Sequence, residues 1–257
     1  MDLEALRQRM GEAAFDYCAA THDKRMHFAN FLEIFRRDIG TVCYAAADGL
    51  LLRLNMPDFY FMSATTMEAA RRMVSLIDVC TLISCREIFY LDLVRKTFGL
   101  NGHNICTQYA FNREAWDGRP FPVPPFEGEV RPLTREHLPL VHQTYHDGQD
   151  DVEYLSSLID TGMLLGLFAL GGALAGFIGF HGEGSAGLLE VLPAYRRKGY
   201  GRVLELSALN YALLDMGQLY PYGQVVRGNE PSLALQATMP QLVFDATELT
   251  WAWQEEA

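Results

Sequence analysis

Cysteine is scarce in this 257-residue sequence and is not spaced for metal binding or cross-linking. The five cysteines form an odd set without a Cys-x-x-Cys pair, which favours reduced thiols over disulfides or a zinc site. The N-terminus also lacks the basic and then apolar segment of a secretory signal peptide. We therefore expect a cytoplasmic protein without structural disulfides.

A metal site is not indicated elsewhere in the sequence. His142 and His146 stand four residues apart, a spacing that zinc sites use on helices. No third ligand that would converge with them is evident, and histidines of this kind more often lie on the surface. We expect no metal.

Long apolar runs are lacking too, apart from residues 162–180, which carry no charge. This stretch of nineteen residues is long enough to suggest a membrane-spanning helix. Six of its residues are glycine, however, and Gly171-Gly172 in its middle predicts a hairpin turn between two buried strands, 163–170 and 173–180. We therefore expect no membrane-spanning segment.

Lysine and arginine are rare in the second half of the chain. Residues 121–257 hold 7 basic and 17 acidic side chains, whereas residues 1–120 hold 14 and 15. Four of those 7 basic residues lie together between Arg196 and Arg202. Nucleic-acid binding needs cationic residues spread along a surface, so this single basic island favours a small, localised anion site.

The basic island lies at a junction between a strand and a helix. An apolar strand is expected at residues 185–192, and helical spacing of apolar residues follows at 203–214. The first N–H groups of a helix lack internal partners and sit at the positive end of its dipole, so they favour a bound phosphate. Gly199 and Gly201 allow the backbone to approach such an anion closely. The turn is therefore typical of a phosphate-binding loop.

Two common nucleotide motifs are absent from this turn. Leu204 stands where a dinucleotide fingerprint needs its third glycine, and no Gly-Lys-Ser/Thr sequence of a P-loop is present. What is present is Arg196-x-x-Gly199-x-Gly201, preceded by Val191-x-Pro193. This pattern resembles the acyl-CoA signature of the GNAT superfamily of N-acyltransferases. The order of expected elements, namely strand, helix, three meandering strands and then the phosphate-binding helix, is similar to the GNAT fold.

The resemblance implies where an acyl-CoA, such as acetyl-CoA, would bind. In the family, the pantetheine arm pairs with the strand before the phosphate loop, and a downstream asparagine lines the same arm; here Asn229 opens the expected helix. The cofactor-binding residues implied by the resemblance are Leu189, Val191, Leu192, Arg196, Arg197, Lys198, Gly199, Tyr200, Gly201, Arg202, Asn229 and Ser232.

The resemblance is weaker for the chemistry. Many GNAT enzymes protonate the leaving thiolate with a tyrosine in a Leu-Tyr pair, but this chain has Leu235-Gln236. Some relatives use a glutamate on the preceding strand as a base acting through water, and Gln224 occupies that position. Glu190, on the strand beside the expected thioester, is our candidate base, although it could equally be paired with a neighbouring cation. Glu190 and Gln224 are the catalytic candidates.

A proline-rich segment divides the chain. Four prolines between Pro120 and Pro125 fix an extended backbone, and we place a linker at residues 116–128. We expect a GNAT acyl-CoA-binding domain at 129–257, whose sheet is completed by strands 242–246 and 249–253. Residues 1–115 read as a second α/β series that lacks the Arg-x-x-Gly-x-Gly turn. This half resembles a degenerate GNAT-like domain, as in the glycine N-acyltransferase-like branch, and we hypothesise that it shapes the acceptor cleft or an oligomer contact.

Two functions of different class remain open. The first is an N-acyltransferase that moves an acetyl or other short acyl group from CoA to an amine of a small molecule or peptide. The second is a non-catalytic module that binds acyl-CoA and has lost its chemistry. The expected fold class is α/β with a mixed sheet in both cases, with no nucleic-acid or membrane partner.

Overall fold

The computed structural model describes residues 2–145, 152–239 and 242–255, and its contacts divide the chain into two compact units. Unit 1 contains the residues up to Arg113 and those from Gln224 onward, and unit 2 is Glu114–Gly223. The expected domains placed 224–257 with the second half of the chain, whereas the contacts group residues 224–257 with the first half. The C-terminal residues instead complete the sheet of the first half.

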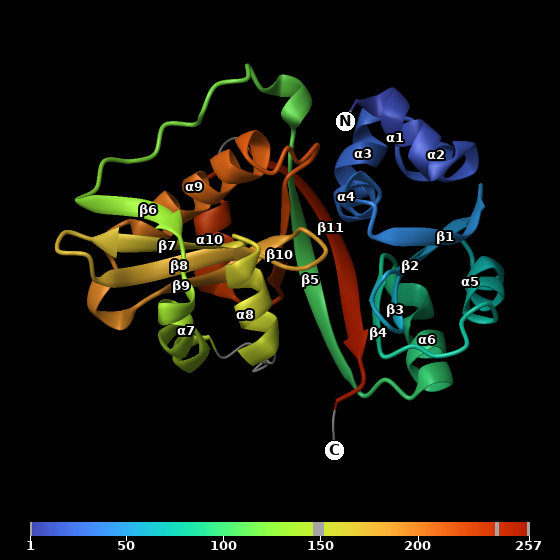
Figure 1. Cartoon of the computed structure of the whole chain (residues 1–257). Coiled ribbons are helices and arrows are strands. Elements are labelled where there is room, and N and C mark those ends of the chain that lie inside the picture. The colour runs from blue at the N-terminus through green and yellow to red at the C-terminus, as the bar shows by residue number, and fades with distance from the viewer. Residues whose placement is uncertain (1, 146–151, 240–241, 256–257) are drawn as a thin grey trace. The chain divides into compact units, whose positions relative to one another are not determined.

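Unit 1 contains seven α-helices among the described residues, together with the short 3-10 turn Ile88–Tyr90 (Figure 1). The helices are α1 (Leu3–Met10), α2 (Glu12–Cys18), α3 (His22–His27), α4 (Ala29–Arg37), α5 (Met67–Val74) and α6 (Leu91–Phe98), and α10 (Glu230–Gln236) follows in the C-terminal part. The strands are β1 (Gly40–Ala46), β2 (Gly49–Leu54), β3 (Phe59–Ala64), β4 (Leu82–Cys85), β5 (Gly102–Phe111) and β11 (Leu242–Trp253).

The sheet of unit 1 has the order β1-β2-β3-β4-β11-β5. Strands β1 to β3 form an antiparallel meander, β3 and β4 are parallel, and β11 runs antiparallel to both β4 and β5. The sequence predicted two short strands at 242–246 and 249–253, and the structure has one strand, with a register shift between Val243 and Thr247. A bulge of this kind interrupts the pairing without ending the strand.

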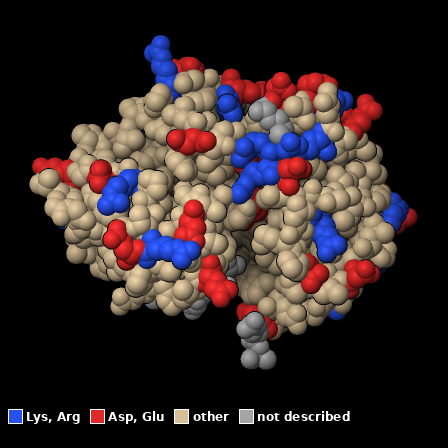
Figure 2. All heavy atoms as spheres, viewed as in Figure 1, with Lys and Arg blue, Asp and Glu red and all other residues tan. Residues whose placement is uncertain are grey.

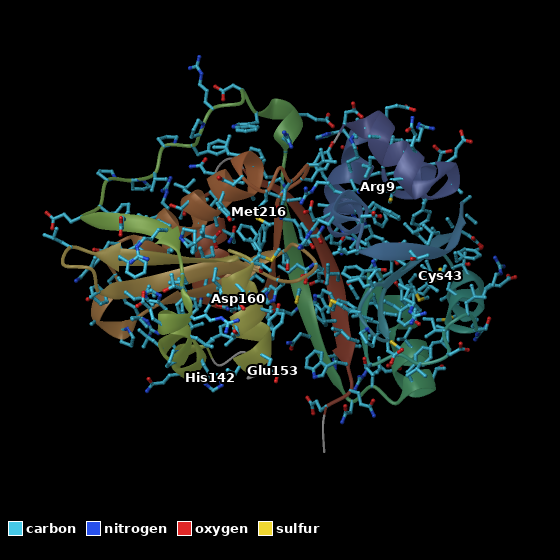
Figure 3. All side chains as sticks on the ribbon, in the orientation of Figure 1. Arg9, Cys43, His142, Glu153, Asp160 and Met216 are labelled. Carbon is cyan, nitrogen blue, oxygen red and sulfur yellow. The ribbon has the colours of Figure 1, made fainter. Side chains whose placement is uncertain are left out.

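Helices cover both faces of this sheet (Figure 1). Helices α1 to α4 pack on one face, where Phe31 meets Phe61 edge to face at 5.6 Å between ring centroids. Helices α5 and α6 pack on the other face around Tyr60, Met62 and Ile83. On the first face Arg9, labelled in Figure 3, donates to the carbonyl oxygens of Phe35 and Arg36 at 3.0 and 2.9 Å and so caps the end of α4.

Unit 2 contains a meander of strands between two groups of helices (Figure 1). Its strands are β6 (Gly128–Pro132), β7 (Leu164–Ala169), β8 (Leu174–Phe180) and β9 (Ala186–Val191), and its helices are α7 (Leu138–Thr144), α8 (Val152–Asp160) and α9 (Tyr200–Leu214). Strand β10 (Tyr222–Val226) crosses the boundary, with Tyr222 and Gly223 in unit 2 and the rest in unit 1. Helix α8 was not expected from the sequence.

The sheet of unit 2 matches the expected meander. Neighbouring strands from β6 to β9 pair antiparallel, and β9 pairs with β10 in parallel. Gly171 and Gly172 form the hairpin with φ of 95° and 85°, a conformation that strongly favours glycine. Helices α7 and α8 pack on one face around Phe168 and Phe177, and α9 packs on the other.

The proline-rich segment is tied to the second unit. The backbone N–H of Phe121 donates to Asn210 Oδ1 at 2.7 Å, and Asn210 Nδ2 donates back to the Phe121 carbonyl oxygen at 3.0 Å. Val123 and Phe126 pack beside α9. This segment is therefore part of the packed unit.

The apolar stretch at 162–180 forms β7 and β8. Within the part of the chain that the structure describes, no helix is both long and apolar enough to span a membrane.

Candidate functional site

Strand β9 contains a bulge in its pairing with β8. Phe177 pairs with Glu190, and Gly179 pairs with Gly187, so Leu188 and Leu189 together lie opposite Ile178 alone. Leu188 has φ of 53°, a left-handed conformation that is uncommon for leucine, and its side chain is 3% exposed. Bulges re-aim backbone groups and are common beside active sites. The sequence offered no signal for this bulge.

The other edge of β9 is mostly unpaired within unit 2. In the described residues, β10 pairs with β9 at Gly223↔Ala186 only. The backbone edge of β9 from Gly187 to Val191 is therefore left without a partner strand on this side, and can form hydrogen bonds to an extended ligand. Leu189, Val191 and Leu192 are half-buried along this edge.

The loop after β9 presents a row of backbone N–H groups. Arg197 and Gly199 both have left-handed backbones, with φ of 65° and 80°, and Gly199 is the N-cap of α9. In the described structure, the N–H groups of residues 197–201 donate to no protein acceptor, while Arg202 and Val203 N–H donate to the Gly199 carbonyl oxygen. Several donors at a helix N-terminus form a site for an anion.

The basic side chains of this loop are exposed. Arg197, Lys198 and Arg202 form no ion pair with an acidic side chain in the described part of the chain, although Lys198 Nζ lies 5.2 Å from the ring centroid of Tyr195. Other arginines of unit 2 differ, because Arg131 and Arg135 contact Glu129 and Asp160 at 2.8 and 2.5 Å. Figure 2 shows such blue and red side chains side by side in its left part. The loop thus retains cationic charge for a ligand.

Glu190 lies close to the loop through Arg196. Arg196 Nη2 is 3.8 Å from Glu190 Oε2, and the Glu190 side chain is 29% exposed. Arg196 Nε also donates to the Val191 carbonyl oxygen at 2.9 Å. Glu190 is therefore paired with a neighbouring cation, Arg196, which is one of the two alternatives that the sequence left open.

Gln224 belongs to a hydrogen-bonded chain within unit 1. Trp251 Nε1 donates to Gln224 Oε1 at 2.5 Å, and Gln224 Nε2 donates to Gln108 Oε1 at 3.4 Å. Gln108 Nε2 in turn donates to the His27 carbonyl oxygen at 3.1 Å. Both ends of the Gln224 amide are therefore occupied by partners in the protein, which favours a structural role for this side chain.

Asn229 and Ser232 lie in unit 1, at the start of α10. Asn229 is the N-cap of this helix and its Oδ1 accepts from the Ser232 N–H at 3.2 Å, as the sequence predicted for a capping turn. Gln236, where the family places a tyrosine, is 8% exposed. Asn229 and Ser232 thus belong to a different unit from the phosphate loop.

One polar pair in unit 2 was missed by the sequence analysis. Tyr154 of α8 and His181, which follows β8, are joined by a hydrogen bond of 2.9 Å between the phenolic oxygen and Nδ1. The two rings are stacked, with centroids 6.4 Å apart and planes inclined by 19°. Since the sequence gave no expectation of α8, nothing connected these two residues before the structure was seen.

Among its described residues, the first half of the chain has no comparable loop. Strands β3 and β4, which precede and follow α5, are paired at four successive positions from Phe59↔Leu82 to Met62↔Cys85. Thr66 caps α5 by accepting from the Ala69 N–H at 3.1 Å. The Ala64 N–H donates to Glu87 Oε2 at 2.9 Å, so a carboxylate of the protein occupies the place of an external anion.

No group of three histidine, cysteine or acidic side chains is placed to hold a metal ion within the described residues. His142, labelled in Figure 3, lies on α7, and His146 lies outside the described residues. No disulfide joins the five cysteines.

Comparison with solved structures identifies the architecture. A Drosophila protein matches with a TM-score of 0.62 and 16% identity over 98% of this chain and 94% of its own. An acetyltransferase of the GNAT family from Colwellia psychrerythraea matches with a TM-score of 0.50 and 14% identity, over 99% and 98%. A tandem GNAT protein from the clavulanic acid biosynthesis pathway has a TM-score of 0.48 and 13% identity, over 89% and 88%.

No family model matches the sequence, and no curated protein does. The glycine N-acyltransferase-like branch therefore stays a prediction. The arrangement of strands and helices, with the basic, glycine-bearing loop between β9 and α9, agrees with the expected fold class. The chain has an α/β fold with a mixed sheet, of the kind found in GNAT acetyltransferases.

Proposed function

We propose that this chain is an N-acyltransferase that moves an acetyl or other short acyl group from CoA to an amine of a small molecule or peptide. The observation that carries the proposal is the row of unpartnered N–H groups at residues 197–201, beside an unpaired edge of β9. A pyrophosphate needs several donors and positive charge, and the loop offers both. An extended arm attached to that pyrophosphate can form hydrogen bonds along β9, as a further strand does.

We assign the cofactor-binding roles accordingly. The N–H groups of the loop bind the pyrophosphate, and the exposed side chains of Arg197, Lys198 and Arg202 add charge-assisted contacts. Leu189, Val191 and Leu192 flank the pantetheine arm along the unpaired edge of β9. The turn itself is formed by Gly199, Tyr200 and Gly201. For Asn229 and Ser232, a role in lining the pantetheine arm rests only on the resemblance to the family.

Acyl-CoA provides an activated thioester. The acceptor amine must be deprotonated in the site so that its nitrogen lone pair can attack that thioester. An alkylamine has a pKa of about 10.4, so freeing its lone pair at pH 7 costs roughly 4 to 5 kcal/mol. Holding the amine and the thioester together provides much of the remaining rate enhancement. The net charge of −11 favours a cationic acceptor, and a cytoplasmic location would supply acetyl-CoA.

Calorimetry with acetyl-CoA, followed by thiol release across a panel of amines, tests the proposal. We expect binding and amine-dependent release of CoA. The double variant Arg197→Glu with Lys198→Glu should weaken binding at least tenfold, whereas Arg131→Glu, on a different strand, should leave it unchanged. Failure of the wild-type protein to bind acetyl-CoA would refute the proposal.

A second candidate is a module that binds acyl-CoA without turnover. It is favoured by Gln224, whose amide is held by Trp251 and Gln108, and by Gln236 in place of a proton donor. Binding of acetyl-CoA without thiol release on any amine would support the module over the enzyme.

A further inference from the structure

The edge of β9 that is available to an extended ligand has a definite end. It begins beside the phosphate loop after Val191 and runs back toward Gly187. At Ala186 the edge closes, because Gly223 of β10 pairs there. A ligand held by its pyrophosphate at the loop therefore places its other end near Gly187 and the bulge at Leu188.

His181 lies against β9 at this end of the edge. A Cβ placed on Gly187 would be 2.7 Å from His181 Nε2 and 3.0 Å from Cδ2, so the imidazole occupies the space that a side chain at 187 would need. The ring therefore packs on the backbone one residue before the bulge, with its Nε2 edge nearest the strand. Glycine at 187 is required for this approach.

Tyr154 fixes the orientation of the ring through Nδ1. The phenolic oxygen lies 2.9 Å from Nδ1, and the two atoms share a hydrogen bond. Burial is the main cause that raises the pKa of Tyr154 well above its usual value, so the phenol stays neutral. A neutral phenol can accept a hydrogen bond from Nδ1–H, and in that tautomer the lone pair of the imidazole is on Nε2.

We propose that His181 is the proton-transfer residue of this site and that Tyr154 is its positioning residue, an inference that rests on the proposed acyltransferase function. The amine nitrogen forms a bond to the thioester carbonyl carbon, and Nε2 takes the proton that the nitrogen loses. The carbon–sulfur bond then breaks, sulfur leaves with the electron pair, and Nε2 returns the proton to it. The amide and the CoA thiol are formed, and the imidazole is neutral again.

The other candidate residues are less suited to proton transfer than His181. Glu190 contacts Arg196, and the Gln224 amide cannot accept a proton at neutral pH. Among these three side chains, His181 is the one that carries an imidazole nitrogen lone pair. General acid–base catalysis by one such residue contributes about 10²- to 10⁴-fold in rate.

The test measures acetyl-CoA affinity and turnover separately. In His181→Ala we expect kcat for thiol release to fall by at least about 100-fold, while the calorimetric Kd for acetyl-CoA changes less than threefold. Imidazole added to the buffer should restore part of the turnover, which a purely structural role would not allow. His142→Ala, which removes a histidine from α7 of the same unit, is the matched control and should keep wild-type kcat.

Two further variants keep the inference testable if His181→Ala folds poorly. Gly187→Ala retains the histidine but displaces its ring, and Tyr154→Phe removes the partner of Nδ1; both should lower kcat with little change in Kd. If His181→Ala keeps the wild-type kcat, or if imidazole restores none of the lost kcat, the proposed role of His181 is contradicted while the acyltransferase proposal stands. A wild-type protein that never releases CoA contradicts the acyltransferase proposal itself.

Discussion

Arg196 Nε donates a hydrogen bond of 2.9 Å to the carbonyl oxygen of Val191, which ties the phosphate loop to the last residue of β9. The same guanidinium lies 3.8 Å from Glu190. The first arginine of the Arg-x-x-Gly-x-Gly pattern therefore holds the loop in place from the protein side, while Arg197 and Lys198 extend into solvent.

This contact predicts a difference between two arginines of the loop. Arg196→Lys keeps the charge but loses the Nε donor, whose net value is about 0.5 to 1.5 kcal/mol, so the Kd for acetyl-CoA should rise by about 2- to 10-fold. Arg197→Lys keeps the charge at a position without such a contact and should alter Kd less than twofold. Calorimetry measures both, and equal effects would contradict the structural role of Arg196.

The left-handed backbone of Gly199 leads to a second prediction, on how substitution at this position affects acetyl-CoA binding. Its φ is 80°, and a Cβ at this position would meet no atom within 4 Å, so substitution is opposed by backbone conformation alone. Gly199→Ala should cost about 1 to 2 kcal/mol and weaken acetyl-CoA binding by about 5- to 30-fold. Gly199→Asn should lose less, because asparagine tolerates the left-handed region better. If alanine binds as tightly as asparagine, the loop does not need this backbone conformation.

The paired strands of unit 1 predict one acyl-CoA per chain. Strands β3 and β4 leave no open edge over their four paired residues, and the donors near α5 are used by Thr66 and Glu87. Titration calorimetry should give a stoichiometry close to one, and the Arg197→Glu, Lys198→Glu variant should weaken this single binding event at least tenfold. A second binding event that survives in this variant would show that the first half also binds acyl-CoA.

Glu87 predicts a pH-dependent contribution to stability. Burial, the largest cause, raises the pKa of its carboxyl, although the Ala64 N–H, the Ser63 hydroxyl and the Tyr90 hydroxyl lower it in part. The folded state thus holds this proton more tightly than the unfolded state, so the stabilising contribution is present below the ordinary pKa and is lost as pH rises through the folded pKa.

The variant Glu87→Gln isolates this effect. The difference in unfolding free energy between Glu87→Gln and the wild type should shift in favour of the variant as pH rises from about 4 through the raised pKa, and then level off. Urea unfolding at several pH values measures it, with Glu68→Gln on the exposed surface of α5 as the control. A pH-independent difference would contradict the raised pKa.

The local elements of the site could be predicted from the sequence because their signals are local. Gly171-Gly172 between apolar runs predicted the hairpin, and Asn229 before Pro231 and Ser232 predicted the N-cap of α10. The basic, glycine-bearing turn after an apolar strand predicted the start of a helix, and Gly199 is the N-cap of α9. Phosphate binding at this turn stays a prediction.

Helix boundaries followed the sequence less closely. In the first half, Gly11, with φ of 80°, ends α1 and separates it from α2. Helix α8 was missed, and with it the contact of Tyr154 with His181. A short amphipathic helix after a polar stretch carries little periodic signal, and its formation depends on packing against β7 and β8.

The sequence by itself determined the Gly171-Gly172 hairpin, the N-cap at Asn229 and the glycine-bearing turn at the start of α9, because turn residues, charge and periodicity act over a few positions. Only the tertiary structure decided that β11 joins the sheet of the first half, that Leu188 forms a bulge, that Glu190 meets Arg196 and that His181 lies on Gly187. These features depend on which strand edges pair and how closely two backbones approach. They are set by packing between residues that are far apart in the chain, so no local sequence pattern predicts them.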